Sequence, residues 1–259
     1  MDSKHSVNCS LFVVFHLRLH EEQYFSKENC FAYGKVGDAI MEVSSPKILD
    51  RVIQCRQMPG FTDKGKHWAE SEFLISMYNS LKEDPNYNRG SELIGFLQYD
   101  HAIKSTTGED LIDFLSQNLE RVDSSTAISF VPINLQAEVT YNHIAMDFSN
   151  TQKLQGDPLC YFTMIADYNK FYDSDHTYTD FRKNNRSIAL CSSFVMTTEN
   201  FMKMMEFCIW AAERNNLDQF DPARRHRLAG GLMERYYGCW MALSGIKLIE
   251  FPLNALERV

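Results

Sequence analysis

A cluster of basic residues stands directly before two glycines, in the segment Arg224-Arg225-His226-Arg227-Leu-Ala-Gly230-Gly231-Leu-Met-Glu234-Arg235. Arginines near a helix start oppose the helix dipole, which favours negative charge at that end, so their placement indicates a bound anion. Guanidinium groups bind phosphate through paired hydrogen bonds. The segment therefore predicts a site for a phosphate or diphosphate group, with Arg227 as its contact.

The two glycines of this segment indicate that something approaches the helix closely. Each glycine inside a helix costs about 0.8–1 kcal/mol relative to alanine, so a backbone or a ligand should occupy the space. Helical spacing places Arg227, Gly230 or Gly231, and Glu234 on one face. This face is either a groove with a cation and a carboxylate, or a packing surface on which Glu234 forms a salt bridge to Arg227 or Arg235.

Asp100 is a second candidate, because it follows an apolar run at 93–97 in the sequence Gln98-Tyr99-Asp100-His101. Ligands of parallel sheets bind beyond the carboxyl ends of the strands. A carboxylate oxygen there can hold Mg²⁺ or Mn²⁺ against a diphosphate. Aspartate at a strand end also caps turns, so the structural alternative stays open.

Other polar residues are less specific. His143 and Asp147 lie four positions apart in a polar stretch and could position a substrate, although such a pair also occurs in solvated turns. Glu72 lies in a helical pattern and could be a surface charge, and Tyr99 could be a core residue. The signatures of dinucleotide-binding proteins, P-loop enzymes and α/β-hydrolases are absent from the sequence.

Alternating strand and helix patterns predict the elements that position these residues. The predicted strands are 11–15, 93–97, 127–131, 188–196 and 246–251. The predicted helices are 46–55, 70–82, 109–119, 158–171, 198–214 and 226–243, with polar irregular stretches at 134–156 and 172–186. This order predicts an α/β fold with a mainly parallel sheet covered by helices.

Composition narrows the class of protein. The 259 residues, of which 44% are hydrophobic, can form one large core, and the net charge of -8 argues against a nucleic-acid-binding surface. No apolar run is long enough for a transmembrane helix or a signal peptide. The seven cysteines include no Cys-x-x-Cys pair, which is typical of reduced thiols. We expect a single cytoplasmic domain over residues 1–259.

Several short motifs occur in the order found in a known family. Ser71-Glu72-Phe73 matches a Ser-Glu-Leu stretch in a helix, and the segment 95–101 matches a strand ending in Gly-Leu-x-His-Tyr-Arg-Arg. The segment 227–235 matches Arg-x-x-Gly-x-x-x-Glu-Arg. Weaker matches are Phe194-Val195-Met196 and the set Pro132, Tyr141, His143 and Asp147. Over residues 10–258 the chain resembles the glycosyltransferase domains of bacterial capsule and O-antigen gene clusters. That family was formerly a domain of unknown function and includes galactofuranosyltransferases.

The resemblance implies a GT-A-like fold and inverting sugar transfer from a nucleotide-sugar donor to a glycan acceptor. It implies a donor-binding half at about 8–132 and an acceptor-binding half at about 133–259. The implied roles are general base for Glu234, donor contacts for Arg227, Glu72, Tyr99, Gly230 and Gly231, and acceptor contacts for His143 and Asp147. The position of Asp100 after the apolar run, and not the resemblance, makes it the expected ligand of a divalent cation, Mn²⁺ or Mg²⁺.

One departure from the family concerns the metal. The family's His-Tyr-Arg-Arg is Gln-Tyr-Asp-His at 98–101, which is closer to the Asp-x-Asp metal motif of GT-A enzymes but lacks its first aspartate. A non-catalytic glycan- or nucleotide-binding module of the same fold is therefore the alternative function. A nucleotidyltransferase is disfavoured because the first strand is not followed by a glycine-rich phosphate loop.

Overall fold

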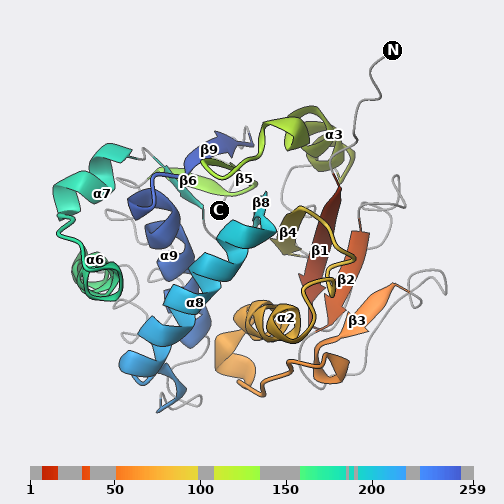
Figure 1. Ribbon diagram of the computed structural model, residues 1–259, viewed down its shortest axis with the longest axis horizontal. Helices are drawn as coiled ribbons and strands as arrows, with labels where there is room; N and C mark the ends of the chain where they lie inside the picture. Colours follow the sequence, from red (N-terminus) through yellow and green to blue (C-terminus); the bar gives the residue numbers. More distant parts are fainter. Residues whose placement is uncertain are drawn as a thin grey trace.

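A seven-stranded sheet forms the centre of the computed structural model, which describes residues 8–16, 31–35, 51–98, 108–134, 158–184, 187–189, 192–219 and 228–251 (Figure 1). Its strands are β1 (Cys9–Phe15), β2 (Phe31–Lys35), β3 (Val52–Gln54), β4 (Leu93–Gln98), β5 (Thr126–Ser129), β8 (Phe194–Thr197) and β9 (Lys247–Glu250). The strand order is β3-β2-β1-β4-β8-β5-β9. All pairs are parallel except those of β8, which runs antiparallel to both β4 and β5. The predicted mainly parallel sheet is thus confirmed.

Strand β1 has apolar side chains on both faces, as its continuous apolar run predicts. Phe12 and Val14 belong to the larger of two hydrophobic clusters, whereas Leu11, Val13 and Phe15 belong to the smaller one. Because successive side chains of a strand point to opposite faces, one sheet can separate the two clusters. The sheet is therefore the middle layer of the molecule.

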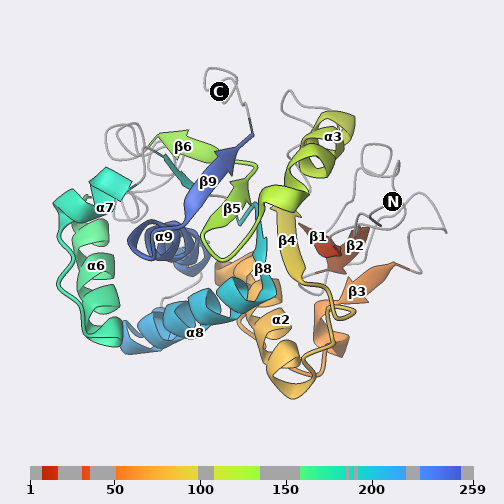
Figure 2. The same cartoon turned by 45° about the horizontal axis from the view of Figure 1, so that its top comes forward.

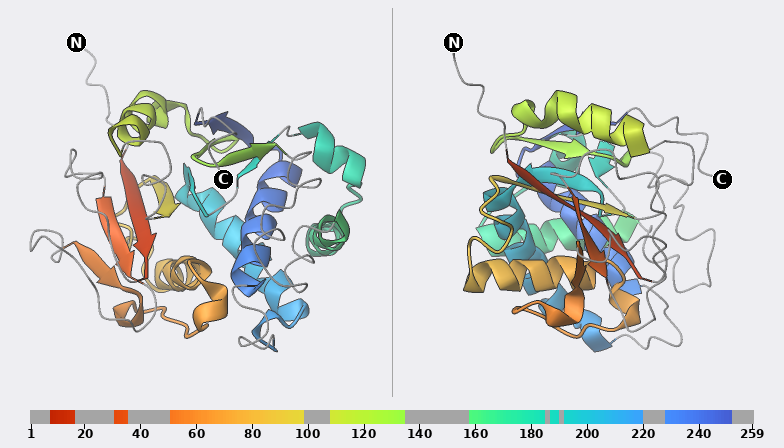
Figure 3. Two further views of the ribbon diagram at one scale, coloured as in Figure 1. Left: turned by 180° about the vertical axis from the view of Figure 1, so that it is seen from behind. Right: turned by 90° about the vertical axis from the view of Figure 1, so that its right-hand side faces the viewer.

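Helices cover both faces of this sheet (Figures 1 and 3). The larger cluster includes side chains from α2 (Ser71–Glu83), α6 (Pro158–Tyr172), α7 (Tyr178–Asn184), α8 (Thr198–Arg214) and α9 (Leu228–Leu243). The smaller cluster includes Leu115 and Phe114 of α3 (Gly108–Asn118). Figure 2 shows α6 and α7 at the end of the molecule remote from β3. Short 3-10 helices are η2 (Cys55–Gln57), η3 (Lys66–Trp68), η5 (Leu119–Arg121) and η7 (Leu217–Gln219).

The ends of α8 and α9 follow the sequence signals. The Thr197 side chain accepts a hydrogen bond from the backbone N–H of Asn200 at 3.1 Å and so caps α8. Gly245 has a φ of 73°, and the backbone N–H of Ile246 donates to the carbonyl oxygen of Met241 at 2.9 Å. Glycine adopts this left-handed conformation without steric cost, which explains where α9 ends.

Three predicted segments need correction. Residues 52–54, expected in a helix, form strand β3, because they find a parallel partner in β2 that the sequence patterns did not reveal. The single strand expected at 188–196 is two strands, β7 (Ser187–Ala189) and β8, and Ser192 between them has a φ of 47°. The polar stretch 172–186 contains helix α7.

Strand β7 belongs to a second, two-stranded antiparallel sheet with β6 (Pro132–Asn134). This small sheet packs against α9. Pro132, expected to close a strand, instead begins β6 after β5 has ended at Ser129. The predicted strand 188–196 therefore contributes to both sheets, whereas 127–131 contributes only to the larger one.

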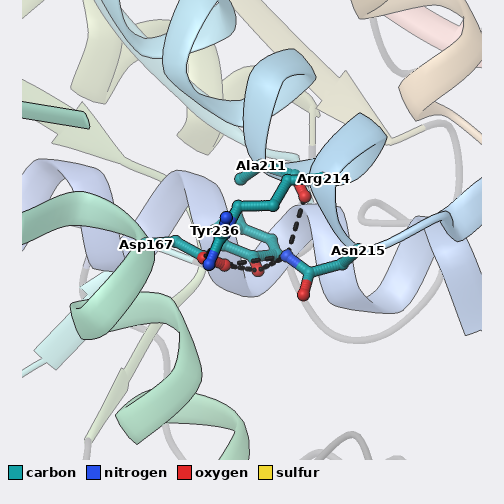
Figure 4. A network of polar contacts seen from close by, with 5 residues as sticks. All are labelled: Asp167, Ala211, Arg214, Asn215 and Tyr236. Atoms are coloured by element: carbon teal, nitrogen blue, oxygen red, sulfur yellow. Dashed lines mark hydrogen bonds and ion pairs between the residues drawn. The ribbon is translucent and has the colours of Figure 1, made fainter. Parts of the chain in front are cut away.

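A buried polar network joins three of the helices (Figure 4). Asp167 of α6 is 3% exposed and accepts hydrogen bonds from Arg214 Nε at 3.0 Å, Tyr236 Oη at 2.7 Å and Asn215 Nδ2 at 2.8 Å. Burial and the Asp167 charge both raise the pKa of Tyr236 far above its usual range. The network fixes α9 against α6 and α8.

The sequence also made predictions about the cysteines and about membrane-spanning helices, which can be compared with the described residues. Among the described cysteines, Cys9, Cys55, Cys160, Cys208 and Cys239 form no disulfide bonds. No helix in the described part of the chain is both long and apolar enough to cross a membrane.

Candidate active site

Helices α2 and α9 both begin at the edge of the sheet where the parallel strands end. Helix α2 leads into β4 and α9 leads into β9, and these two strands run in the same direction as β1. Each helix must return across the sheet before the next parallel strand starts, so its first turn lies at the carboxyl edge. Ligands of such sheets bind at this edge.

Gly230 lies in the first turn of α9 and packs against the backbone just before α2, so the first turns of the two helices lie close together. A Cβ atom at position 230 would lie 2.8 Å from the carbonyl oxygen of Trp68 and 3.1 Å from Cβ of Ala69. No side chain fits that space without a shift of the backbone. The close approach predicted for the glycines is therefore, at Gly230, an approach of protein backbone. Gly231 is buried, and its carbonyl oxygen accepts a hydrogen bond from Arg235 Nη1 at 2.8 Å.

Glu72 lies in the first turn of α2 and holds the preceding loop. Its Oε2 atom accepts hydrogen bonds from the backbone N–H groups of Lys64 and Gly65, both at 3.1 Å. The side chain is 5% exposed, so the interpretation of Glu72 as a surface charge is wrong. Because the loop leads directly into η3, this carboxylate positions the backbone on which Gly230 packs.

Glu234 lies in the second turn of α9 and is 7% exposed. Tyr237, one turn further along, is fully buried. Burial raises the pKa of Tyr237 well above its usual range, and the charges of Glu234 and Glu70 act in the same direction. The hydroxyl of Ser71 lies beside that of Tyr237 and acts in the opposite direction. Tyr237 thus lies near both the carboxylate of α9 and the residues that open α2.

The α2–α9 junction, which we define as Lys64–Glu72 together with Gly230–Tyr237, therefore contains three buried carboxylates, Glu70, Glu72 and Glu234. A carboxylate shielded from water can accept a proton from a hydroxyl group that binds beside it. Of the three, Glu234 is the one that the sequence motif at 227–235 predicts for that role, whereas Glu72 binds the loop backbone. Arg235 is also buried, and its Nη1 donates a hydrogen bond to the carbonyl oxygen of Gly231 in the same helix.

The structure brings Glu72, Gly230, Gly231 and Glu234 together at this junction. Five further predicted site residues, Tyr99, Asp100, His143, Asp147 and Arg227, lie outside the described residues. For Asp100 and Arg227, the neighbouring described residues show which element each of them adjoins. Asp100 follows the central strand β4 by two positions, and Arg227 directly precedes the first residue of α9.

A divalent cation stays a prediction of the sequence. In the part of the chain that the structure describes, no group of three or more His, Cys, Asp or Glu side chains could hold a metal ion. The expected ligand, Asp100, lies outside that part.

Sequence reasoning missed His67, Glu70 and Tyr237. Glu70 adjoins the Ser71-Glu72 motif, and that proximity was the available signal for it. Tyr237 looked like one more apolar residue of α9, and His67 lies in a loop with no periodic pattern. Their importance follows from the packing of α9 on η3, which joins segments more than 150 residues apart in the sequence.

Comparison with known proteins identifies the fold. No family model and no curated protein matches the sequence. Among solved structures, the apo structure of WbbM, a bifunctional glycosyltransferase, is similar with a TM-score of 0.56 and 12% sequence identity. The likeness covers 94% of this chain and 44% of that chain, so this chain spans less than half the length of the protein that it resembles. At this identity the likeness shows the fold alone: a single-domain α/β structure like that of a glycosyltransferase.

Proposed function

We propose that this chain is a glycosyltransferase that moves a sugar from a nucleotide-sugar donor to a glycan acceptor with inversion. The acceptor hydroxyl attacks the anomeric carbon while the bond from that carbon to the diphosphate oxygen breaks. The hydroxyl proton passes to the carboxylate of Glu234, and the negative charge leaves with the nucleoside diphosphate. Residues 8–132 bind the donor and residues 133–259 bind the acceptor.

The position of Glu234 carries this proposal. A buried carboxylate in the second turn of a helix that begins at the carboxyl edge of the sheet can reach a ligand bound there. The glycosyltransferase-like fold supports the same class of reaction, and the match of 227–235 to a transferase motif supports the same residue.

Arg227 is the proposed cation for the leaving group. It directly precedes α9, whose first backbone N–H groups also favour an anion. Arg227 thus supplies positive charge where the departing diphosphate gains negative charge. Asp100 is the proposed ligand of a divalent cation that neutralises the same group. Loss of turnover in excess chelator, restored by Mn²⁺ or Mg²⁺, tests this part separately.

The test is Glu234→Gln, which keeps the shape of the side chain but cannot accept the proton. Release of nucleoside diphosphate from a panel of UDP-, GDP- and dTDP-sugars measures donor hydrolysis, with water in place of the acceptor. We expect the turnover to fall roughly 10²–10⁴-fold while donor binding, measured by thermal shift, is retained. Glu213→Gln, an exposed glutamate on α8, is the matched control.

Two results would contradict the proposal. Near-normal turnover of Glu234→Gln together with a lower unfolding temperature would make Glu234 a structural salt-bridge partner. Tight nucleotide-sugar binding by the wild-type chain, without hydrolysis or transfer, would favour a non-catalytic binding module.

A further inference from the structure

His67 is a buried imidazole with no hydrogen-bond partner among the residues that the structure describes. Its side chain is 8% exposed, and in the described part of the chain neither Nδ1 nor Nε2 has a partner. A buried polar group left unpaired lowers stability, and most such groups in folded proteins are paired. A residue retained at such a cost needs a reason other than the stability of the fold.

The surroundings of His67 do not supply that reason. Its ring contacts the Trp68 ring at a centroid distance of 6.1 Å, and its Nδ1 would lie 3.6 Å from a Cβ atom at Gly65. The charges that act on His67 are those of Asp218 and Lys64, which form an ion pair with each other at 2.7 Å. The Trp68 indole Nε1 is also buried, and no described residue accepts its hydrogen bond.

The place of His67 in the fold points to a ligand. It belongs to η3, and the following residue of η3, Trp68, contacts Gly230 of α9. Gly230 lies one turn before Glu234. His67 also lies on the loop that Glu72 holds through Lys64 and Gly65. His67 is therefore part of the α2–α9 junction and belongs to the half of the chain proposed to bind the donor.

We propose that His67 contacts the donor's sugar, with its two imidazole nitrogens hydrogen-bonding hydroxyl groups of the transferred glycosyl unit. This inference rests on the proposed function. A neutral imidazole offers one N–H donor and one nitrogen acceptor, which matches a hydroxyl group better than a phosphate, which only accepts. Burial lowers the pKa of His67, and Lys64 acts in the same direction while Asp218 opposes it, so the neutral form is favoured.

Access to the nitrogens requires a local movement of the loop. The outer attachment of the loop is the Lys64–Asp218 ion pair, in which the Lys64 side chain is 16% and the Asp218 side chain 55% exposed. An ion pair with one well-exposed partner contributes little to stability, so this attachment can open when a ligand binds, while Glu72 still holds Lys64 and Gly65.

The test is His67→Phe, measured in two ways. Thermal unfolding without ligand compares its midpoint with that of the wild-type protein. Binding of UDP-, GDP- and dTDP-sugars is then compared with binding of UDP, GDP and dTDP, because the difference isolates the contribution of the sugar. We expect an unchanged or higher midpoint and a loss of roughly 10-fold in the sugar contribution, with nucleoside diphosphate binding retained. His176→Phe, a histidine outside the junction, should leave the sugar contribution unchanged.

A lower midpoint for His67→Phe would overturn the inference, because the imidazole would then stabilise the fold. A retained sugar contribution would overturn it as well, and would leave the proposed function intact. If no nucleotide-sugar binds the wild-type protein, the proposed function fails and this inference fails with it. If the phenylalanine variant does not fold, His67→Leu replaces it in both measurements with the same criteria.

Discussion

Replacement of Glu72 tests whether this residue binds the donor directly or holds the loop that carries His67. Its Oε2 accepts two backbone N–H groups, from Lys64 and Gly65, at 3.1 Å each. Hydrogen bonds to charged groups contribute about 1.5–3 kcal/mol each. Gly65 is exposed and Lys64 partly exposed, so water can replace part of the interaction, and the lower figure applies.

For Glu72→Ala we therefore expect the free energy of unfolding to fall by about 3 kcal/mol, from two bonds of about 1.5 kcal/mol. For a chain of this size that corresponds to roughly 6–12 °C in the unfolding midpoint. Glu72→Gln keeps an acceptor oxygen but loses the charge, so its loss should be about half as large. Glu83→Ala, at the exposed end of the same helix, should stay within about 0.5 kcal/mol of the wild-type protein.

Chemical denaturation of the four proteins, followed by circular dichroism, measures these differences, and nucleotide-sugar binding below the transition measures the second effect. If Glu72 anchors the loop, the free energy of unfolding should decrease in the order Glu83→Ala, Glu72→Gln, Glu72→Ala. The reasoning is refuted if Glu72→Ala unfolds like the wild-type protein. If it does so and also loses nucleoside diphosphate binding, Glu72 is a direct donor contact.

Two further substitutions test the packing around the site. Gly230→Ala gains about 0.8–1 kcal/mol of helix propensity, but its Cβ would lie 2.8 Å from the Trp68 carbonyl oxygen, and overpacking costs about 1–3 kcal/mol. We expect a net loss of stability in denaturant unfolding, and a more stable variant with weaker donor binding would contradict the packing role. Breaking a buried ion pair costs about 3–5 kcal/mol. Because the Arg214 side chain is 43% exposed, we expect Asp167→Asn to lower the free energy of unfolding by roughly 3 kcal/mol, the lower end of that range. Unchanged thermal unfolding would show that the network does not fix α9.

The local elements of this protein could be predicted where one short segment carries its own pattern. The run Leu11–Phe15 needs only its apolar residues to predict a strand buried on both faces. Helix α8 begins directly after its cap, Thr197, and α9 ends before Gly245, because capping depends on the backbone conformation of a few neighbouring residues. The mainly parallel sheet also follows from the order of such segments.

Strand pairing could not be predicted in the same way. Val52 and Cys55 have a spacing that suits a helix, yet residues 52–54 pair with β2 as a strand. The direction of β8 and the separation of β7 into a second sheet depend on partners elsewhere in the chain. Pairing energy comes from contacts between distant segments, and these contacts override a weak local preference.

For the candidate site, the sequence by itself determined the residues with distinctive chemistry: Glu234 beside its glycines, and Glu72 in its motif. Only the tertiary structure decided how these residues are used. It placed Gly230 against the Trp68 backbone, bound Glu72 to its loop, and buried His67 where no described residue is its hydrogen-bond partner. The physical reason is that burial and hydrogen bonding are properties of the packed chain. A side chain's type states which bonds it can form, and only packing decides which of them it forms.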